Sequence, residues 1–157
     1  MADPSFLFLI AGLSVSLAGF SGLVVAFRRG GPLTPTDAYR LRQIPEIGLT
    51  TALMAVGSVP VADTVGVGSP AVRIMSGFAL VFTTAHIATL WARRRKMQLR
   101  QDMSATLRDG LVFLAIIAGA GFSIAIGSAV AYEWLLALML ARPMVAFVMV
   151  LADVASG

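Results

Sequence analysis

The stretch AGFSGLVVAFRRG (residues 18–30) joins a run of apolar residues to a pair of arginines, and it decides the fold. The run begins at Ser5 and contains no ionisable residue before Arg28. A helix needs about 20 mostly apolar residues to cross a bilayer. The start of the chain lacks the basic segment and the small-residue cleavage site of a signal peptide. We therefore expect residues 5–27 to be retained as a membrane-spanning helix.

The composition of the whole chain agrees with a membrane location. Apolar residues make up 58% of the 157 residues and charged residues only 13%, whereas soluble domains average about half apolar and a quarter charged residues. The mean hydropathy of +0.87 favours a protein with several spans, folded as one membrane domain over residues 1–157. The absence of cysteine excludes disulfides, a thiolate metal site and a thiol nucleophile.

Four further segments are long and apolar enough to be expected as spans. The second span is the weakest because it contains Glu46 and Pro60, and the fifth is interrupted by Arg142 and Pro143. The predicted fold is an all-α, polytopic integral membrane helix bundle with five transmembrane helices. Their expected ranges are residues 5–27, 44–62, 70–92, 111–131 and 134–152. The sequence AYEW (131–134) is expected to form the turn between the last two spans.

Basic residues are concentrated in two of the expected loops. Of the twelve lysines and arginines, four lie between the first and second spans and six between the third and fourth. These are Arg28, Arg29, Arg40, Arg42, Arg93, Arg94, Arg95, Lys96, Arg100 and Arg108. Positively charged loops remain on the cytoplasmic side, so the N-terminus is expected outside and the C-terminus inside a bacterial inner membrane. The net charge of +4 could suggest nucleic-acid binding, but the basic residues lie between apolar blocks. We therefore expect the protein to contact membrane lipids and not nucleic acid.

Local signals near these loops predict where helices begin and end. Thr34 followed by Pro35 is typical of a helix N-cap and first helical position, so a helix should begin there and run into the second span. The third helix should extend past Lys96, and Ser104 should cap the fourth. Aromatic residues are enriched at membrane interfaces, and they occur near the expected span ends as Trp91, Tyr132 and Trp134.

Small residues recur every four positions in the first and fourth spans. Such stripes let helix backbones approach closely within a bilayer, so we expect helix packing within the chain or between copies in a homo-oligomer. The alternative is a stripe that lines a pore or a flat cofactor. The residues concerned are Ser14, Ala18, Gly22, Ala26, Ala115, Gly119, Ser123 and Gly127, with Gly19 adjacent to the first stripe. The repeated AGFS (18–21 and 120–123) is better explained by chance or packing than by an inverted repeat.

Three ionisable residues fall inside the expected spans and are the candidate functional residues. Glu46 and His86 occur at similar depth, so they could pair to relay protons or to coordinate a cation. The structural alternative for Glu46 is an interfacial position stabilised by the helix N-terminus or by a contact with Arg42. For the imidazole, the alternative is a hydrogen bond to a threonine. The threonines within expected reach are Thr50, Thr83 and Thr84.

Arg142 is the third of these residues and lies deepest. It is about 12 Å from Trp134 by helical rise, beyond comfortable reach of the outer interface. We expect it to face protein, a water-filled cavity or an anion, with a partner from another subunit, an anionic lipid or a bound acid. The alternative is a side chain that extends outward from a displaced fifth helix.

Motifs for most known activities are missing from the sequence. There is no phosphate-binding loop, dinucleotide-binding glycine pattern, zinc-protease motif or serine-hydrolase motif. A single histidine does not make a His-rich metal site, so no metal is expected. The sequence TTAHIATLWARRR (83–95) is similar to antenna polypeptides, which would make His86 an axial ligand for a chlorin pigment. Phe82 departs from that pattern, which has a small residue four positions before the histidine.

The first 50 residues also carry a resemblance to a family. LSVSLAGFSGLVVAFRRG (13–30), followed by DAYRL (37–41), resembles a group of small bacterial multi-span inner-membrane proteins of unassigned function with a first helix of the AGFSGLV type. The resemblance implies a membrane protein of several helices and provides no catalytic residues.

Two functional hypotheses follow from the sequence. The first is a homo-oligomeric ion or proton channel or transport assembly, with Glu46, His86 and Arg142 as its polar determinants. The alternative is a non-catalytic structural or accessory subunit of a larger membrane complex, which could bind lipid or pigment. An enzyme is not expected, because no nucleophile and base are recognisable together.

Overall fold

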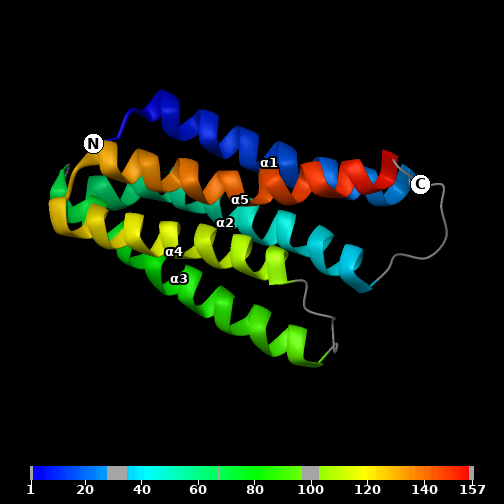
Figure 1. Ribbon diagram of the computed structural model, residues 1–157. Coiled ribbons are helices and arrows are strands. Elements are labelled where there is room, and N and C mark those ends of the chain that lie inside the picture. The colour runs from blue at the N-terminus through cyan, green and yellow to red at the C-terminus, as the bar shows by residue number, and fades with distance from the viewer. Residues whose placement is uncertain (1, 28–34, 67, 97–102, 156–157) are drawn as a thin grey trace.

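The chain folds into a bundle of helices that alternate in direction (Figure 1). The computed structural model describes residues 2–27, 35–66, 68–96 and 103–155. Within these ranges it contains five helices and no strand, which confirms the predicted all-α class. The helices are α1 (Pro4–Phe27), α2 (Pro35–Val65), α3 (Ser69–Lys96), α4 (Met103–Ile126) and α5 (Ala129–Ala155).

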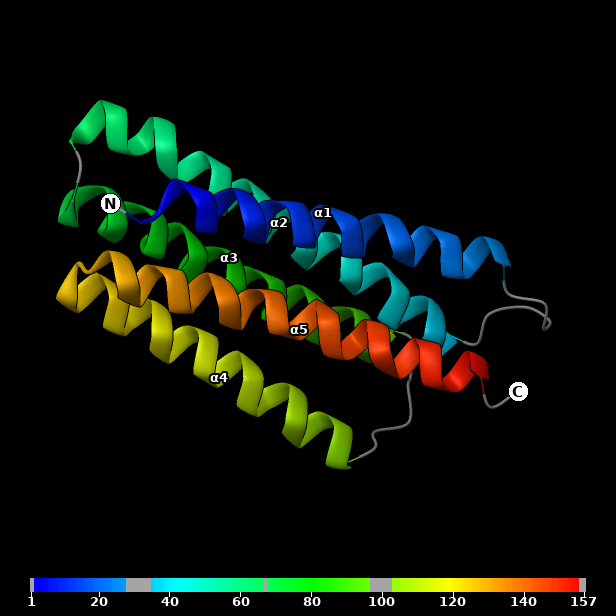
Figure 2. The same cartoon turned by 90° about the horizontal axis from the view of Figure 1, so that it is seen from above.

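The fifth helix is the centre of the bundle. It contacts each of the other four helices, whereas α1 contacts only α2 and α5. Figure 2 shows α5 between α1 and α4. The side chains of Leu135, Leu136 and Met139 are buried completely in the core around α5. Arg142 comes from the same helix, so its placement in the interior follows from the central position of α5.

The lengths and exposed surfaces of the helices are those of a membrane protein. Four of them, α1, α2, α3 and α5, are long and apolar enough to cross a bilayer. In α4 the apolar part is Gly110–Ile126, which is shorter. Large apolar side chains on the outer faces are exposed, among them Phe8, Phe78, Phe122 and Val148. All five helices expose large apolar side chains, which lipid would cover in a membrane.

The helix expected to run from Pro35 into the second span is confirmed, because α2 is continuous from Pro35 through the second apolar segment. Several other features expected near the loops lie outside the described residues. These are the N-cap at Thr34, the extension of α3 past Lys96, and Arg28, Arg29 and Arg100. The same holds for the side chains of Ala26, Arg40, Arg94, Lys96, Ser104 and Arg108.

The turn between the last two helices was predicted at the wrong place. It lies at Gly127 and Ser128, and AYEW is part of α5. Gly127 has a φ of +66°, and its N–H donates to the carbonyl of Ser123 at 2.8 Å. Glycine is favoured at this position after a helix because other residues rarely adopt such a φ. Gly127 therefore ends α4 and is not a helical member of the small-residue stripe.

A close contact between α1 and α2 involves a glycine that the stripes did not include. A Cβ added to Gly48 of α2 would lie 2.9 Å from the carbonyl oxygen of Ser14 and 3.9 Å from the Cβ of Ala18. Ser14 is fully buried at this contact. Gly19 and Gly22 of α1 have no neighbour within 4 Å of an added Cβ among the described atoms. Ser14 and Ala18 thus face α2, while Gly19 and Gly22 face outward.

The small residues of α4 face two different helices. Ser123 accepts a hydrogen bond from the hydroxyl of Ser76 in α3 at 2.8 Å, and both side chains are fully buried. A Cβ on Gly119 would be in van der Waals contact with leucine side chains of α5. Ala115 lies on the exposed surface. The small residues of α4 therefore do not form one interface, because Ser123 faces α3 and Gly119 faces α5.

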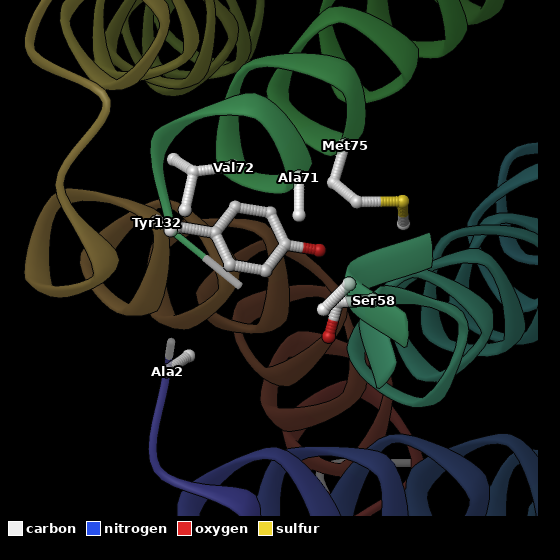
Figure 3. Close-up of a pocket in the computed structure, with 8 residues that line it drawn as sticks. Ala2, Ser58, Ala71, Val72, Met75 and Tyr132 are labelled. Atoms are coloured by element: carbon white, nitrogen blue, oxygen red, sulfur yellow. The ribbon is translucent and has the colours of Figure 1, made fainter. Parts of the chain in front are cut away.

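Tyr132, which was expected in the aromatic belt at the membrane interface, is buried within the protein near Ala2, at the end of the bundle where the N-terminus lies. It is only 1% exposed, and its hydroxyl donates to the carbonyl of Met54 in α2 at 2.8 Å. Figure 3 shows the ring between α3 and the buried Ala2, with its hydroxyl directed toward the helix that carries Ser58. A buried phenol needs a hydrogen-bond partner, and this carbonyl supplies one. Trp91 and Trp134 are exposed, as an interfacial position requires.

Candidate polar site in the bundle

Glu46 binds two arginines. The Nε of Arg42, one turn earlier in α2, donates to Glu46 Oε1 at 2.8 Å. Arg93 of α3 donates from Nη1 to Oε1 at 3.2 Å and to Oε2 at 3.3 Å. The hydrogen-bonded Glu46–His86 pair considered from the sequence is not formed, and the alternative contact with Arg42 is present. Arg93 adds a link between α2 and α3 that the sequence did not indicate.

Arg142 lies inside the protein and not at the outer interface. It is 6% exposed, and its Nη2 donates to the side-chain oxygen of Gln43 in α2 at 2.9 Å. Its guanidinium carbon is 5.1 Å from the ring centroid of Phe113 in α4, within the range of a cation–π contact. Helix α2 thus supplies an amide oxygen and α4 supplies an aromatic ring as neighbours of the Arg142 guanidinium.

Gln43 is a site residue that the sequence interpretation missed. It is 3% exposed, although glutamine is usually a surface residue. Gln43 precedes Glu46 by three positions and Ile47 by four, so all three lie on one face of α2. That spacing could have placed Gln43 beside Glu46, but it gave no indication of the contact with Arg142.

His86 is buried between aromatic rings. It is 7% exposed, stacks on Phe82 with a centroid distance of 5.6 Å, and lies 6.3 Å from the ring of Phe113. Its Nε2 has no hydrogen-bond partner within the described part of the chain. The threonine hydrogen bonds expected for this ring are not formed by Thr50 or Thr84, whose hydroxyls donate to carbonyls of their own helices.

His86 and Arg142 line the same small cavity, although 56 positions separate them in the sequence. The cavity has room for about one water molecule. Its polar members are Thr83, His86 and Arg142, and its apolar members are Ile47, Phe82, Phe113, Ile116 and Met139. Four helices contribute to it, so the site exists only once α2, α3, α4 and α5 have packed together.

The polar side chains form one group, which we call the polar cluster: Gln43, Glu46, His86, Arg93 and Arg142. The side chains of Arg93 and Glu46 are 37% and 29% exposed, whereas the other three members are buried. The charges of Glu46, Arg93 and Arg142 all act on His86. The polar cluster therefore extends from the surface, at the end of the bundle where α3 ends, to a buried cavity in its interior.

The arrangement around His86 limits what could bind there. Among the described residues no group of three or more His, Cys, Asp or Glu side chains could hold a metal ion. Phe82 and Phe113 cover the imidazole, and the adjoining space is that of one water molecule, so a chlorin would fit only if these rings moved. Comparisons with protein-family models, with curated proteins and with solved structures found no match to this chain.

Proposed function

We propose that the chain is an integral membrane protein that conducts protons or small ions, with the polar cluster as the determinant of conduction. The observation that carries this proposal is the graded burial of the polar cluster, from the partly exposed Arg93 and Glu46 to the buried His86 and Arg142. Ionisable residues within membrane spans are costly, and where they persist they mark ion pathways and proton relays.

The proposed topology has five spans, with the basic loops in the cytoplasm of a bacterium. An arginine at the centre of a lone membrane helix is disfavoured by about 2.5–3.5 kcal/mol on insertion scales. Burial of Arg142 beside Gln43 reduces that penalty by replacing lipid with a hydrogen-bond acceptor. On this topology the exposed end of the polar cluster faces the cytoplasm, and the cavity lies further into the membrane.

The active form is proposed to be a homo-oligomer. In the described part of the chain, the core around α5 is filled by fully buried side chains such as Leu135, Leu136 and Met139. Gly19 and Gly22 of α1 face outward and would allow the close approach of a helix from a second copy. Ions would then reach the polar cluster through its partly exposed members, Glu46 and Arg93.

Proton flux into proteoliposomes tests the proposed function. With a potassium diffusion potential and a trapped pH-sensitive dye, the wild type should acidify the vesicles faster than protein-free controls. Arg93→Gln should lower this flux about tenfold or more, the change produced by raising a barrier by about 1.4 kcal/mol. The matched control is Arg95→Gln, because Arg95 lies outside the polar cluster and packs on Trp91 at 3.9 Å.

Two results would contradict conduction through the polar cluster. One is equal proton flux in the Arg93 and Arg95 variants. That result would mean that membership of the polar cluster makes no difference to conduction. The other is a wild type that carries neither protons nor other small ions. If such an inactive protein co-purified with a different membrane protein, the accessory-subunit function would replace the present proposal.

A further inference from the structure

The cavity beside His86 combines two features that point to a bound molecule. Nε2 of His86 is fully buried and has no hydrogen-bond partner in the described part of the chain. Buried polar atoms are nearly always satisfied by protein or by ordered water. The cavity that His86 lines has room for about one water molecule, and Thr83 and Arg142 line it as well. Three of the residues that line the cavity thus carry a polar group that can bond to a water molecule.

We propose that His86 is the proton-binding residue of the protein and that it exchanges its proton with a single water molecule held in this cavity. The inference rests on the proposed function and deepens it, since it identifies the conducted species as the proton. Thr83 offers a hydroxyl that can donate or accept, and Arg142 offers guanidinium N–H donors. The water would be held by these two side chains and by Nε2 of His86.

The exchange needs no group beyond the water and the imidazole. In the neutral tautomer with its hydrogen on Nδ1, the lone pair of Nε2 is free to accept a proton. A hydronium in the cavity transfers its proton to Nε2: one O–H bond breaks, one N–H bond forms, and water and an imidazolium remain. The reverse step returns the proton. Arg142 stays protonated throughout, so it orients the water and does not carry the proton.

The groups around His86 suit a proton better than a metal cation because they lack a set of metal ligands. Glu46 from α2 attracts positive charge, while Arg93 from α3 and Arg142 from α5 oppose it. The described part of α4 faces the cavity with Phe113 and Ile116, which carry no charge. A sodium or potassium ion would require several oxygen ligands, which this cavity does not offer. A proton needs only the lone pair of Nε2.

The protonation of His86 can be followed directly by ¹⁵N NMR, because the chain contains only one histidine. In protein labelled with ¹⁵N-histidine and held in detergent micelles, we expect the ring nitrogens to show one reversible protonation step between about pH 4 and pH 9, the range that contains imidazole titration. Ring nitrogens that keep one protonation state over this whole range would overturn the inference. This measurement uses the wild type and does not depend on the folding of a variant.

Transport by variants provides the second arm of the test. His86→Phe should abolish proton flux, and Thr83→Val should lower it several-fold by removing a partner of the water. The matched control is Thr84→Val, whose hydroxyl donates to the carbonyl of Leu80 on the outside of the bundle, and its flux should equal that of the wild type. Wild-type flux in His86→Phe would overturn the inference and leave the proposed function intact. A ring that titrates in a protein without flux would support the site and contradict the proposed function.

Discussion

Replacing Gln43 by leucine is expected to lower the free energy of unfolding by about 1.5–3 kcal/mol, the usual value of a hydrogen bond to a charged group. The bond from Arg142 Nη2 to Gln43 Oε1 is 2.9 Å long and fully enclosed. Leucine has a similar volume but offers no acceptor, so a buried cation loses one of its hydrogen bonds. The measurement is an equilibrium unfolding curve in detergent micelles, with the helical circular dichroism signal as the probe.

Two further variants separate the lost hydrogen bond from a general packing defect. Gln43→Glu keeps an acceptor oxygen in the same position, so it should retain most of the stability. Arg142→Met should be less harmful in the Gln43→Leu background than in the wild type, because the bond between the two residues is then already lost. Strictly additive effects of Gln43→Leu and Arg142→Met would contradict the energetic role assigned to this contact.

Gly48→Leu is expected to have the next largest effect, a loss of about 1–3 kcal/mol from overpacking at the contact between α1 and α2. Even the Cβ of the new side chain would lie 2.9 Å from the carbonyl oxygen of Ser14, closer than real Cβ contacts allow. The obstacle is main chain and cannot rotate away, so α1 must move. Thermal unfolding in detergent, compared with the wild type, gives the loss.

The matched control for this variant is Gly12→Leu. Gly12 lies on α1, where an added Cβ meets no described atom within 4 Å. Both substitutions replace a glycine in a helix by the same residue, so the intrinsic helical preference changes equally. A stability loss that is equal in the two variants would show that the proximity of Gly48 to Ser14 is not what limits the packing.

The positions of the helices follow closely from the sequence, whereas one turn does not. Runs of about 20 apolar residues and the signal at Pro35 locate the helical segments, because the bilayer requires such runs. The last turn was expected at AYEW because this short segment lies between the last two expected spans. The chain instead turns at Gly127, whose positive φ determines the site of the break, and Glu133 lies in the first turns of α5.

The ionisable residues of the site were also recognisable in the sequence, but their partners were not. Glu46, His86 and Arg142 are conspicuous because charged and titratable groups are rare within apolar segments. Their contacts depend on the axial register and rotation of α2, α3 and α5 relative to one another. Packing of the core determines these parameters, so the contacts of Gln43 with Arg142 and of Arg93 with Glu46 emerge only in three dimensions.

The central claim of the proposed topology is that all five helices of the bundle around the polar cluster cross the membrane. Labelling of single cysteines with an impermeant maleimide tests it most directly, since the natural chain has no cysteine to interfere. Val65→Cys and Ser128→Cys, at the two turns that share one end of the bundle, should react from outside the cell. Ala92→Cys, near the end of α3, should react only from the cytoplasmic side. Reaction of Ser128→Cys from the cytoplasmic side would mean that α4 does not cross the membrane, and it would contradict the account.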